Sequence, residues 1–215
     1  PRGRPRKNDA ASPKASARSR AAAARASLSF NRKLALNQWL LGLFGVERFD
    51  QLAARLQEAP GVVGVMPYVE GQVMVSAHGV ASGALVRGVR PAELGDRDVI
   101  AENVLQGSLV GLNAPSTAAI GSRMAQRMAL GLGSQITLIS PKGAATALGS
   151  VPRVKTFSVA AIFEVGMYEY DNSFVYIPLA DAQAYFQLPE RVNAVEIMVE
   201  DPERIAAYRP DLLTR

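Results

Sequence analysis

Few residues of this chain have the types and spacing that catalysis or metal binding requires. His78 is the only histidine, and the absence of cysteine removes disulfides, thiolate nucleophiles and Cys-rich zinc sites. The sequence holds no G-x-S-x-G elbow for a Ser–His–Asp triad, no Gly-Lys-Ser/Thr phosphate loop and no G-x-G-x-x-G turn. We therefore expect His78 to be a turn residue beside Gly79. We also expect no cofactor, and no enzyme activity from this chain on its own.

Two groups of carboxylates are the remaining candidates for chemistry. The first group is Asp96, Asp98 and Glu102, and the second is Glu164, Glu169 and Asp171. Neither has the spacing of an EF-hand, and the first contains its own arginine as a counter-charge. We interpret both groups as solvated carboxylates and predict no metal site.

Tyr168 and Tyr170 lie among the carboxylates of the second group, in a segment (166–172) that we predict to be a loop. Exposed tyrosine is typical of protein contact surfaces. These two tyrosines are therefore a candidate contact surface.

The elements that position these residues centre on residues 133–165. Two runs, 134–140 and 154–163, alternate bulky apolar residues with polar or small ones, which predicts strands with one buried face. Residues 141–153 between them are mostly small and too many for a tight turn. We predict a long loop there, and a loop of this length commonly carries function.

The basic character of the chain belongs to its first residues. Residues 1–33 hold ten Lys/Arg and one Asp, whereas the rest holds 14 Lys/Arg and 18 Asp/Glu. With almost no large apolar residue, 1–33 are predicted to be a disordered basic tail, either a solvated or non-native segment or an arm that binds nucleic acid or anionic lipid. No aromatic residue precedes Phe30, so base stacking has no support, and we expect no nucleic-acid partner. Residues 34–48 are a short apolar segment of uncertain role, and no run reaches the length of a membrane span.

The other patterns interleave strands and helices, which predicts an α+β or α/β fold rather than a helical bundle, and we take α+β as the expected class. We expect helices at 49–59, 91–94, 123–130 (capped by Ser122), 179–187 and from 202, and a helix or connector at 98–106. Strands are expected at 62–68 and 71–75, with Pro67 at an edge or bulge, and at 81–89, 118–121, 173–177 and 192–199. Gly83 and Gly88 indicate close backbone approach.

An ordered set of segments resembles one family. Phe49-Asp-Gln-Leu-Ala-Ala-Arg-Leu, Pro60-Gly-Val and Pro67-Tyr-Val-Glu-Gly-Gln72 are similar to the opening of the periplasmic domain of bacterial lipoprotein-releasing permeases of the LolC/LolE type. Further similar segments are 81–91, 120–138 and 174–186. The resemblance covers about residues 49–205. It implies a MacB-like periplasmic core over residues 49–215, with an α/β, porter-like subdomain, a smaller β-rich subdomain and a protruding β-hairpin at 134–165.

The resemblance also implies a function. The parent protein would be an inner-membrane subunit of an ABC transporter, with this domain in the periplasm and transmembrane helices beyond both ends. It would work with a cytoplasmic ATPase subunit, a second permease subunit, lipoprotein substrates and a periplasmic lipoprotein carrier. An interaction domain of another MacB-like exporter, or of a cell-division relative, shares this fold and stays an alternative.

In LolC-type subunits a hairpin called the hook recruits the carrier, and the stretch from Thr146 to Pro152 is similar to its tip pattern Thr-Pro-Met-Gly-x-Ile-Pro. Ala147 replaces the tip proline. The resemblance implies that Leu148 and Val151 enter an apolar cavity of the carrier, while Arg153 and Lys155 meet its acidic groups. The predicted carrier-binding residues are Pro141, Thr146, Ala147, Leu148, Gly149, Val151, Pro152, Arg153 and Lys155. The alternative is an ordinary long hairpin, as in the LolE-type partner.

Overall fold

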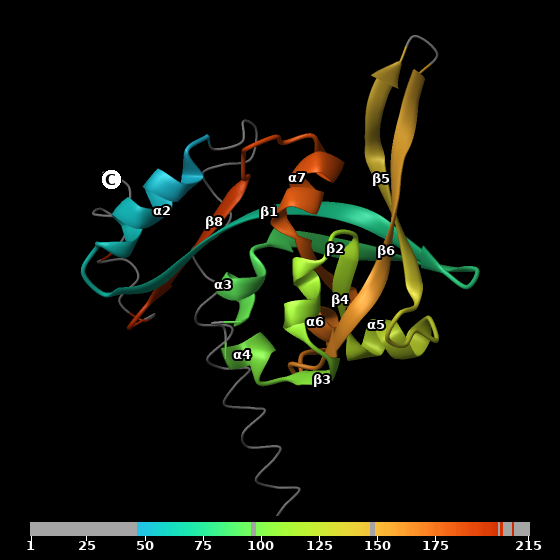
Figure 1. The fold of residues 1–215 in the computed structure, drawn as a ribbon, viewed down its shortest axis with the longest axis horizontal. Coiled ribbons are helices and arrows are strands. Elements are labelled where there is room, and N and C mark those ends of the chain that lie inside the picture. The colour runs from blue at the N-terminus through green and yellow to red at the C-terminus, as the bar shows by residue number, and fades with distance from the viewer. Residues whose placement is uncertain (1–46, 96–97, 147–148, 202, 204–207, 209–215) are drawn as a thin grey trace, which may run out of the picture.

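The computed structural model describes residues 47–95, 98–146, 149–201, 203 and 208 (Figure 1). Its helices are α2 (Phe49–Gln57), α3 (Pro91–Gly95), α4 (Asp98–Ala101), the 3-10 helix η1 (Leu109–Asn113), α5 (Ser122–Arg127), α6 (Tyr168–Ser173) and α7 (Leu179–Phe186). Its strands are β1 (Val62–Ala77), β2 (Val80–Val89), β3 (Val104–Gly107), β4 (Thr117–Gly121), β5 (Gln135–Thr146), β6 (Gly149–Phe163), β7 (Phe174–Pro178) and β8 (Ala194–Val199). The predicted α+β class is confirmed.

Six of the strands pair with one another in a closed ring. β1 pairs antiparallel with β2 and β5, β2 runs parallel to β7, and β7 pairs antiparallel with β4. β4 runs parallel to β6, and β6 returns antiparallel to β5. The ring thus satisfies the backbone groups of these strands and leaves β3 and β8 as additions at β6 and β1.

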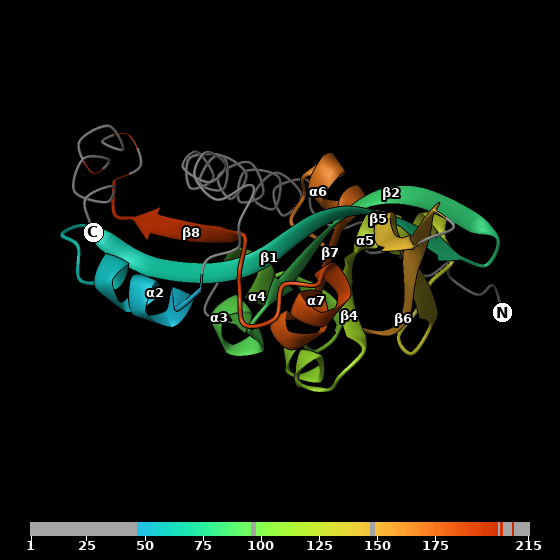
Figure 2. The same cartoon turned by 90° about the horizontal axis from the view of Figure 1, so that it is seen from above.

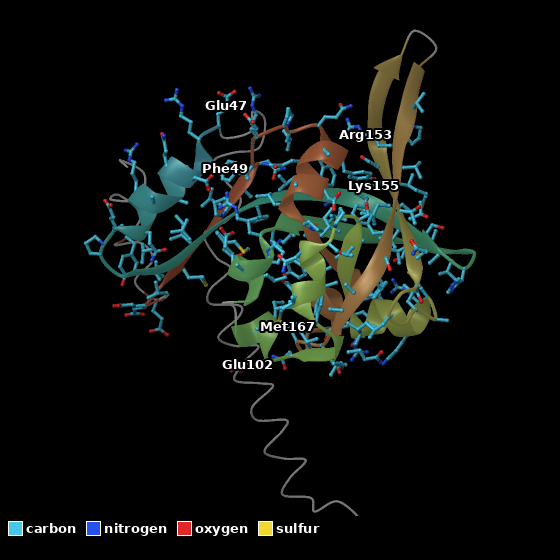
Figure 3. The ribbon with its side chains drawn as sticks, viewed as in Figure 1. Glu47, Phe49, Glu102, Arg153, Lys155 and Met167 are labelled. Atoms are coloured by element: carbon cyan, nitrogen blue, oxygen red, sulfur yellow. The ribbon has the colours of Figure 1, made fainter. Side chains whose placement is uncertain are left out.

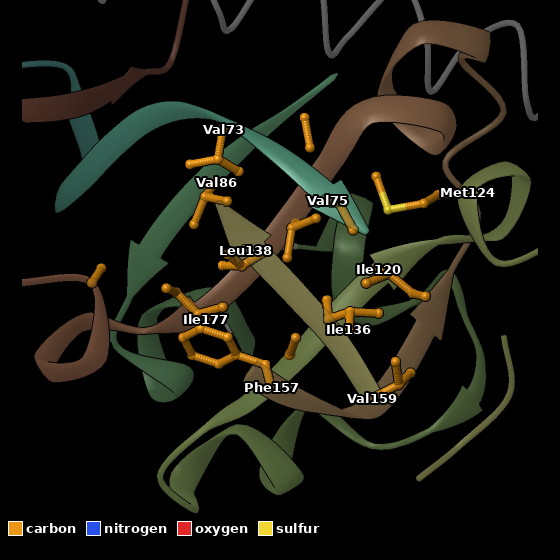
Figure 4. Close-up of a cluster of buried hydrophobic side chains, with 14 of the residues drawn as sticks. Val73, Val75, Val86, Ile120, Met124, Ile136, Leu138, Phe157, Val159 and Ile177 are labelled. Carbon is orange, nitrogen blue, oxygen red and sulfur yellow. The ribbon is translucent and has the colours of Figure 1, made fainter. Parts of the chain in front are cut away.

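Alternation along the strands sends side chains to two separate cores. One core lies on the inner side of the ring and includes Val75, Val86, Ile136, Phe157 and Ile177, all buried (Figure 4). Residues one place along the same strands join a second core on the outer face. Members of the second core include Tyr68, Val89, Phe163 and Tyr176.

β1 is one strand of 16 residues, although the pattern predicts two. Its first half pairs with β8 and includes Pro67 opposite Val195, and its second half pairs with β2. Figure 2 shows α2, β8 and the first half of β1 together at one end of the molecule. The strand continues through Pro67, which is still paired with β8, and its partner changes to β2 two residues later, at Val69.

The turn between β1 and β2 agrees with the sequence. His78 and Gly79 connect the paired Ala77 and Val80, and both have positive φ, 48° and 77°. Such a two-residue turn matches the twist of the hairpin. The His78 Nδ1 atom lies 3.2 Å from the Met128 carbonyl oxygen, so this histidine is a structural residue.

One glycine prediction is confirmed and one is wrong. A Cβ atom on Gly88 would lie 2.0 Å from the Cβ atom of Ala182, because α7 packs directly on β2. A Cβ atom on Gly83 would have no atom within 4 Å. Only Gly88 therefore marks a close approach.

Four local predictions are corrected. Residues 141–146 and 149–153 are not a loop but continue β5 and β6. Of the predicted loop 166–172, only the first two residues precede α6, which begins at Tyr168. Ser122 does not cap α5; Gly121 is the N-cap, and Ser122 is a buried residue of the first turn. The segment 98–106 divides into α4 and the start of β3.

Within the described residues, no helix is both long and apolar enough to span a bilayer. The predictions for residues 1–33, for residues 34–48 and for the helix from 202 concern residues that lie largely outside the described ones.

Candidate functional site

The β5–β6 hairpin is anchored at its base. Residues 135–140 of β5 pair with 153–158 of β6, and Leu138 also pairs with Val75 of β1. Ile136, Leu138 and Phe157 are fully buried. The first half of β5 and the part of β6 from Arg153 onward are therefore part of the ring.

Beyond Ser140 the hairpin extends away from the body (Figure 1). The pairing shifts between Ser140 and Ala144 and resumes as far as Thr146 opposite Gly149. Pro141 and Pro152 lie at this irregularity, where the lack of an N–H group costs no regular ladder bond. The strands reach further than the alternating pattern predicts.

Two exposed apolar residues, Val151 and Pro152, lie on the projecting part of β6, and a third, Val154, lies at the base opposite Ile139. Val151 is 56% exposed and Val154 61% exposed, and Pro152 between them is also exposed. Of the predicted binding residues, Val151 and Pro152 thus present accessible surface. Ala147 and Leu148 lie outside the described residues, and for Pro141, Thr146 and Gly149 the structure describes the backbone only.

Arg153 and Lys155 have partners within the chain. Arg153 donates from Nη1 to the Tyr185 carbonyl oxygen at 3.1 Å and from Nη2 to Gln187 Oε1 at 3.0 Å. Lys155 Nζ lies 2.5 Å from Asp181 Oδ1. Figure 3 shows both basic residues at the base of the hairpin, beside α7. Their role toward an acidic carrier stays a prediction, and their observed role is to hold the hairpin against α7.

Further bonds strengthen this brace. The Tyr185 hydroxyl donates to the Arg153 carbonyl oxygen at 3.2 Å, and burial raises the pKa of Tyr185 to about 12. The second oxygen of Asp181 accepts from the Ser116 N–H at 2.7 Å. With one end fixed by hydrogen bonds and by the ring, the hairpin projects in a defined direction.

The structure separates the two tyrosines of the predicted contact surface, and the contact role of Tyr168 stays a prediction. Tyr168 is 64% exposed, but Tyr170 is 4% exposed and stacks on Phe174 with a centroid distance of 3.7 Å. Its hydroxyl bonds to that of Tyr176, and burial raises the pKa of Tyr170 well above its ordinary value. Tyr170 is therefore a core residue and is not part of a contact surface.

Asp171 is also buried, so its interpretation as a solvated carboxylate is wrong. Its Oδ1 and Oδ2 accept from the N–H groups of Val165 (2.8 Å) and Gly166 (3.0 Å). This pairing closes the turn that leads into α6. No group of three or more metal-binding side chains occurs among the described residues.

The sequence reasoning missed a buried charge cluster. Arg87 of β2 is 5% exposed, and its Nε lies 2.6 Å from Glu70 Oε2 while its Nη1 lies 4.0 Å from Glu196 Oε2. The guanidinium also lies 4.8 Å from the ring centroid of Tyr68 and 5.0 Å from that of Phe174. In the sequence, a lone arginine inside the apolar run 84–89 is the feature that indicates a buried charge. The cluster joins β1, β2 and β8.

Comparison with known proteins is consistent with this arrangement. The MacB-like periplasmic core domain matches residues 14–214. The match therefore includes residues 14–33, which the sequence analysis assigned to the tail.

Two relatives are lipoprotein-releasing system transmembrane proteins LolC. That of Neisseria meningitidis serogroup B is 28% identical over 156 residues, covering 71% of this chain and 37% of the relative. That of Xylella fastidiosa is 25% identical over 157 residues, covering 73% and 38%. The chain thus spans under two fifths of the length of these relatives.

The fold also matches a solved structure, the periplasmic region of MacB from Actinobacillus actinomycetemcomitans. The TM-score is 0.52 at 11% identity, and the match covers 79% of this chain and 72% of that one. At this identity the likeness concerns the fold alone. The chain therefore belongs to the MacB-like periplasmic core domain family, as a periplasmic domain of an ABC transporter permease that is similar to LolC.

Proposed function

We propose that this domain recruits a periplasmic lipoprotein carrier through the β5–β6 hairpin, as part of an inner-membrane lipoprotein-releasing permease. The observation that carries the proposal is a hairpin that projects from the ring and presents Val151, Pro152 and Val154 to solvent. Similarity to LolC proteins supplies the class of cargo.

The exposed valines suit an apolar cavity. A carrier of lipoproteins must shield acyl chains, so its binding surface is apolar, and side chains of the hairpin are of the kind that such a surface buries. Each exposed valine that becomes fully buried contributes about 1.5 kcal/mol to binding. Since the brace to α7 fixes the hairpin base before binding, little ordering entropy is lost there.

The domain itself is non-catalytic in this proposal. ATP would be hydrolysed by a separate cytoplasmic subunit, and the two permease subunits would transmit the resulting motion to the periplasm. The ring and the brace give the hairpin a rigid connection to the body of the domain, so a motion of the domain would move the hairpin with it.

The test is capture of the carrier encoded in the same genome by the purified 215-residue chain. Val151→Asp with Val154→Asp should weaken binding about 100-fold, because two carboxylates would be desolvated at the contact. Val63→Asp with Val110→Asp is the matched control, since these valines are 53% and 72% exposed elsewhere on the surface. Equal affinity of the hairpin variant and the control would refute the hairpin assignment.

A further inference from the structure

A second surface site lies between α5 and α6. Its pocket has a volume of about 350 Å³ and is lined by Arg123, Gln126, Arg127, Tyr168 and Asn172. Every lining side chain carries a hydrogen-bond donor, and none is a carboxylate. The pocket is thus positively charged and open to solvent.

Its two arginines lack a charged partner among the described residues. The Arg123 guanidinium lies over the Tyr168 ring, 4.9 Å from the centroid. Arg127, one helical turn later, donates to Asn172 and, at 2.8 Å, to Ser82 Oγ. All of these contact partners are neutral, although the Arg123 charge also favours the ionised form of the nearby Asp171.

The neighbouring acid does not neutralise them by contact. Asp171 directs both carboxylate oxygens to backbone N–H groups at the start of α6. Glu169 is exposed on the same short helix. The aromatic contact holds Arg123 and the amide contact holds Arg127, so both guanidinium groups are ordered before any ligand arrives.

We propose that this pocket binds a phosphate group. Two guanidinium groups, a phenol hydroxyl and two side-chain amides offer donors in several directions, which suits the tetrahedral oxygens of phosphate better than a planar carboxylate. The pocket needs no movement of the chain to be occupied, because its lining is already in place.

The position of the pocket indicates where such a group comes from. α5 lies at the opposite end of β5 from the hairpin tip (Figure 1), and Met167, next to Tyr168, lies at the same lower end of the molecule (Figure 3). The proposed function assigns the hairpin to the carrier, so this pocket, near the other end of β5, stays free for a ligand of the membrane or of the solution. Lipid headgroups are then one source of the phosphate, and free phosphate is the other.

The experiment is a titration of the full 215-residue chain followed by two-dimensional ¹H–¹⁵N NMR. The backbone amide signals of Gln126, Tyr168 and Asn172 report on the pocket alone, so the basic residues 1–33 do not contribute to the readout. The added ligands are inorganic phosphate, a short-chain phosphatidylglycerol below its micelle concentration, and acetate, at matched ionic strength.

Both phosphate compounds should shift these signals saturably, and acetate should bind at least about tenfold more weakly. Arg123→Gln with Arg127→Gln should weaken phosphate binding by about 100-fold, and Arg123→Gln alone by about tenfold. Arg55→Gln with Arg191→Gln removes the same charge from the far end of the domain and should leave binding unchanged. Tighter binding of the lipid than of free phosphate identifies the headgroup as the source, and equal binding identifies phosphate itself.

Three results would overturn the proposal: no saturable shift with either phosphate compound, equal binding of acetate, or unchanged binding by the arginine variants. If circular dichroism shows that the double variant is unfolded, Arg123→Gln decides, because this substitution keeps the hydrogen bonds of Arg127 to Asn172 and Ser82. Carrier capture is measured with hairpin variants and does not depend on these signals. The failure of either proposal is therefore recognised independently of the other.

Discussion

The buried ion pair between Arg87 and Glu70 provides the sharpest test of how the domain is held together. Glu70→Gln keeps the size and shape of the side chain but removes its charge. The Arg87 guanidinium then stays buried at 5% exposure, without its partner at 2.6 Å. Removing one member of a buried pair costs about 3–5 kcal/mol of unfolding free energy.

Three features place the expected cost of Glu70→Gln at the lower end, about 3 kcal/mol. The Glu70 side chain is 15% exposed, so it is not fully desolvated. Glu196 remains 4.0 Å from Arg87, and the rings of Tyr68 and Phe174 still contact the guanidinium. Arg87→Met should cost more, about 5 kcal/mol, because both carboxylates then stay in the core without a cation.

Urea unfolding followed by far-UV circular dichroism measures these costs, provided that the slopes of the transitions agree. The double variant Glu70→Gln with Arg87→Met should lose at least about 1 kcal/mol less than the sum of the single losses. Asp50→Asn is the control. Its carboxylate also pairs with an arginine, Arg90, at 2.5 Å but is 66% exposed, so the loss should stay below about 1 kcal/mol. If Glu70→Gln costs no more than Asp50→Asn, the cluster does not stabilise the joint between β1, β2 and β8.

Further predictions concern the packing around α6 and α7. Gly121→Ala should lower the unfolding free energy by about 2–3 kcal/mol, because the added Cβ would lie 2.1 Å from the Asp171 carbonyl oxygen. Urea unfolding measures this loss, and an unchanged midpoint would contradict the close packing. Asp171→Asn should cost about 1–3 kcal/mol, since an amide NH₂ would face one of the two backbone N–H donors; Glu169→Gln on the same helix is the control. Lys155→Met should leave the unfolding free energy within about 1 kcal/mol, because the Lys155 side chain is 31% exposed. It should nevertheless weaken carrier capture if the contact with Asp181 holds the hairpin, and full capture would show that the brace is dispensable.

Elements with a strong local pattern could be predicted from the sequence. The apolar spacing of Leu52 and Leu56 specifies α2, and Pro60-Gly61 ends it close to the observed boundary. The His78-Gly79 pair specifies a two-residue hairpin turn, since glycine readily adopts the positive φ that such a turn needs. In these cases the residues that determine the structure are neighbours in the chain.

The outer hairpin and α6 could not be predicted in the same way. Residues 141–146 are small or turn-forming and have weak strand preference, so they form a strand only because β6 runs alongside. Tyr170 lies in a polar sequence, and its burial depends on Phe174 and Tyr176, which reach it only when α6 folds back on β7. Long-range contacts decide both outcomes.

The candidate site shows the same division. Exposure of Val151 and Tyr168 follows from their positions near a strand end and on a short helix, and it agrees with the prediction. The brace from Arg153 and Lys155 to α7 depends on residues about 30 positions away in the chain, which no local pattern reveals. A basic residue near a hairpin tip can therefore serve the fold as well as a partner.

The central claim, that the hairpin contacts the carrier, is tested most directly by site-specific photo-crosslinking in living cells. A photoreactive amino acid replaces Val154 in the whole permease and, in a separate strain, replaces Val110, which is also exposed but lies on η1. We expect a crosslink to the periplasmic lipoprotein carrier from position 154 and none from position 110. A crosslink from position 110 alone, or from neither position while the permease is active, would contradict the account.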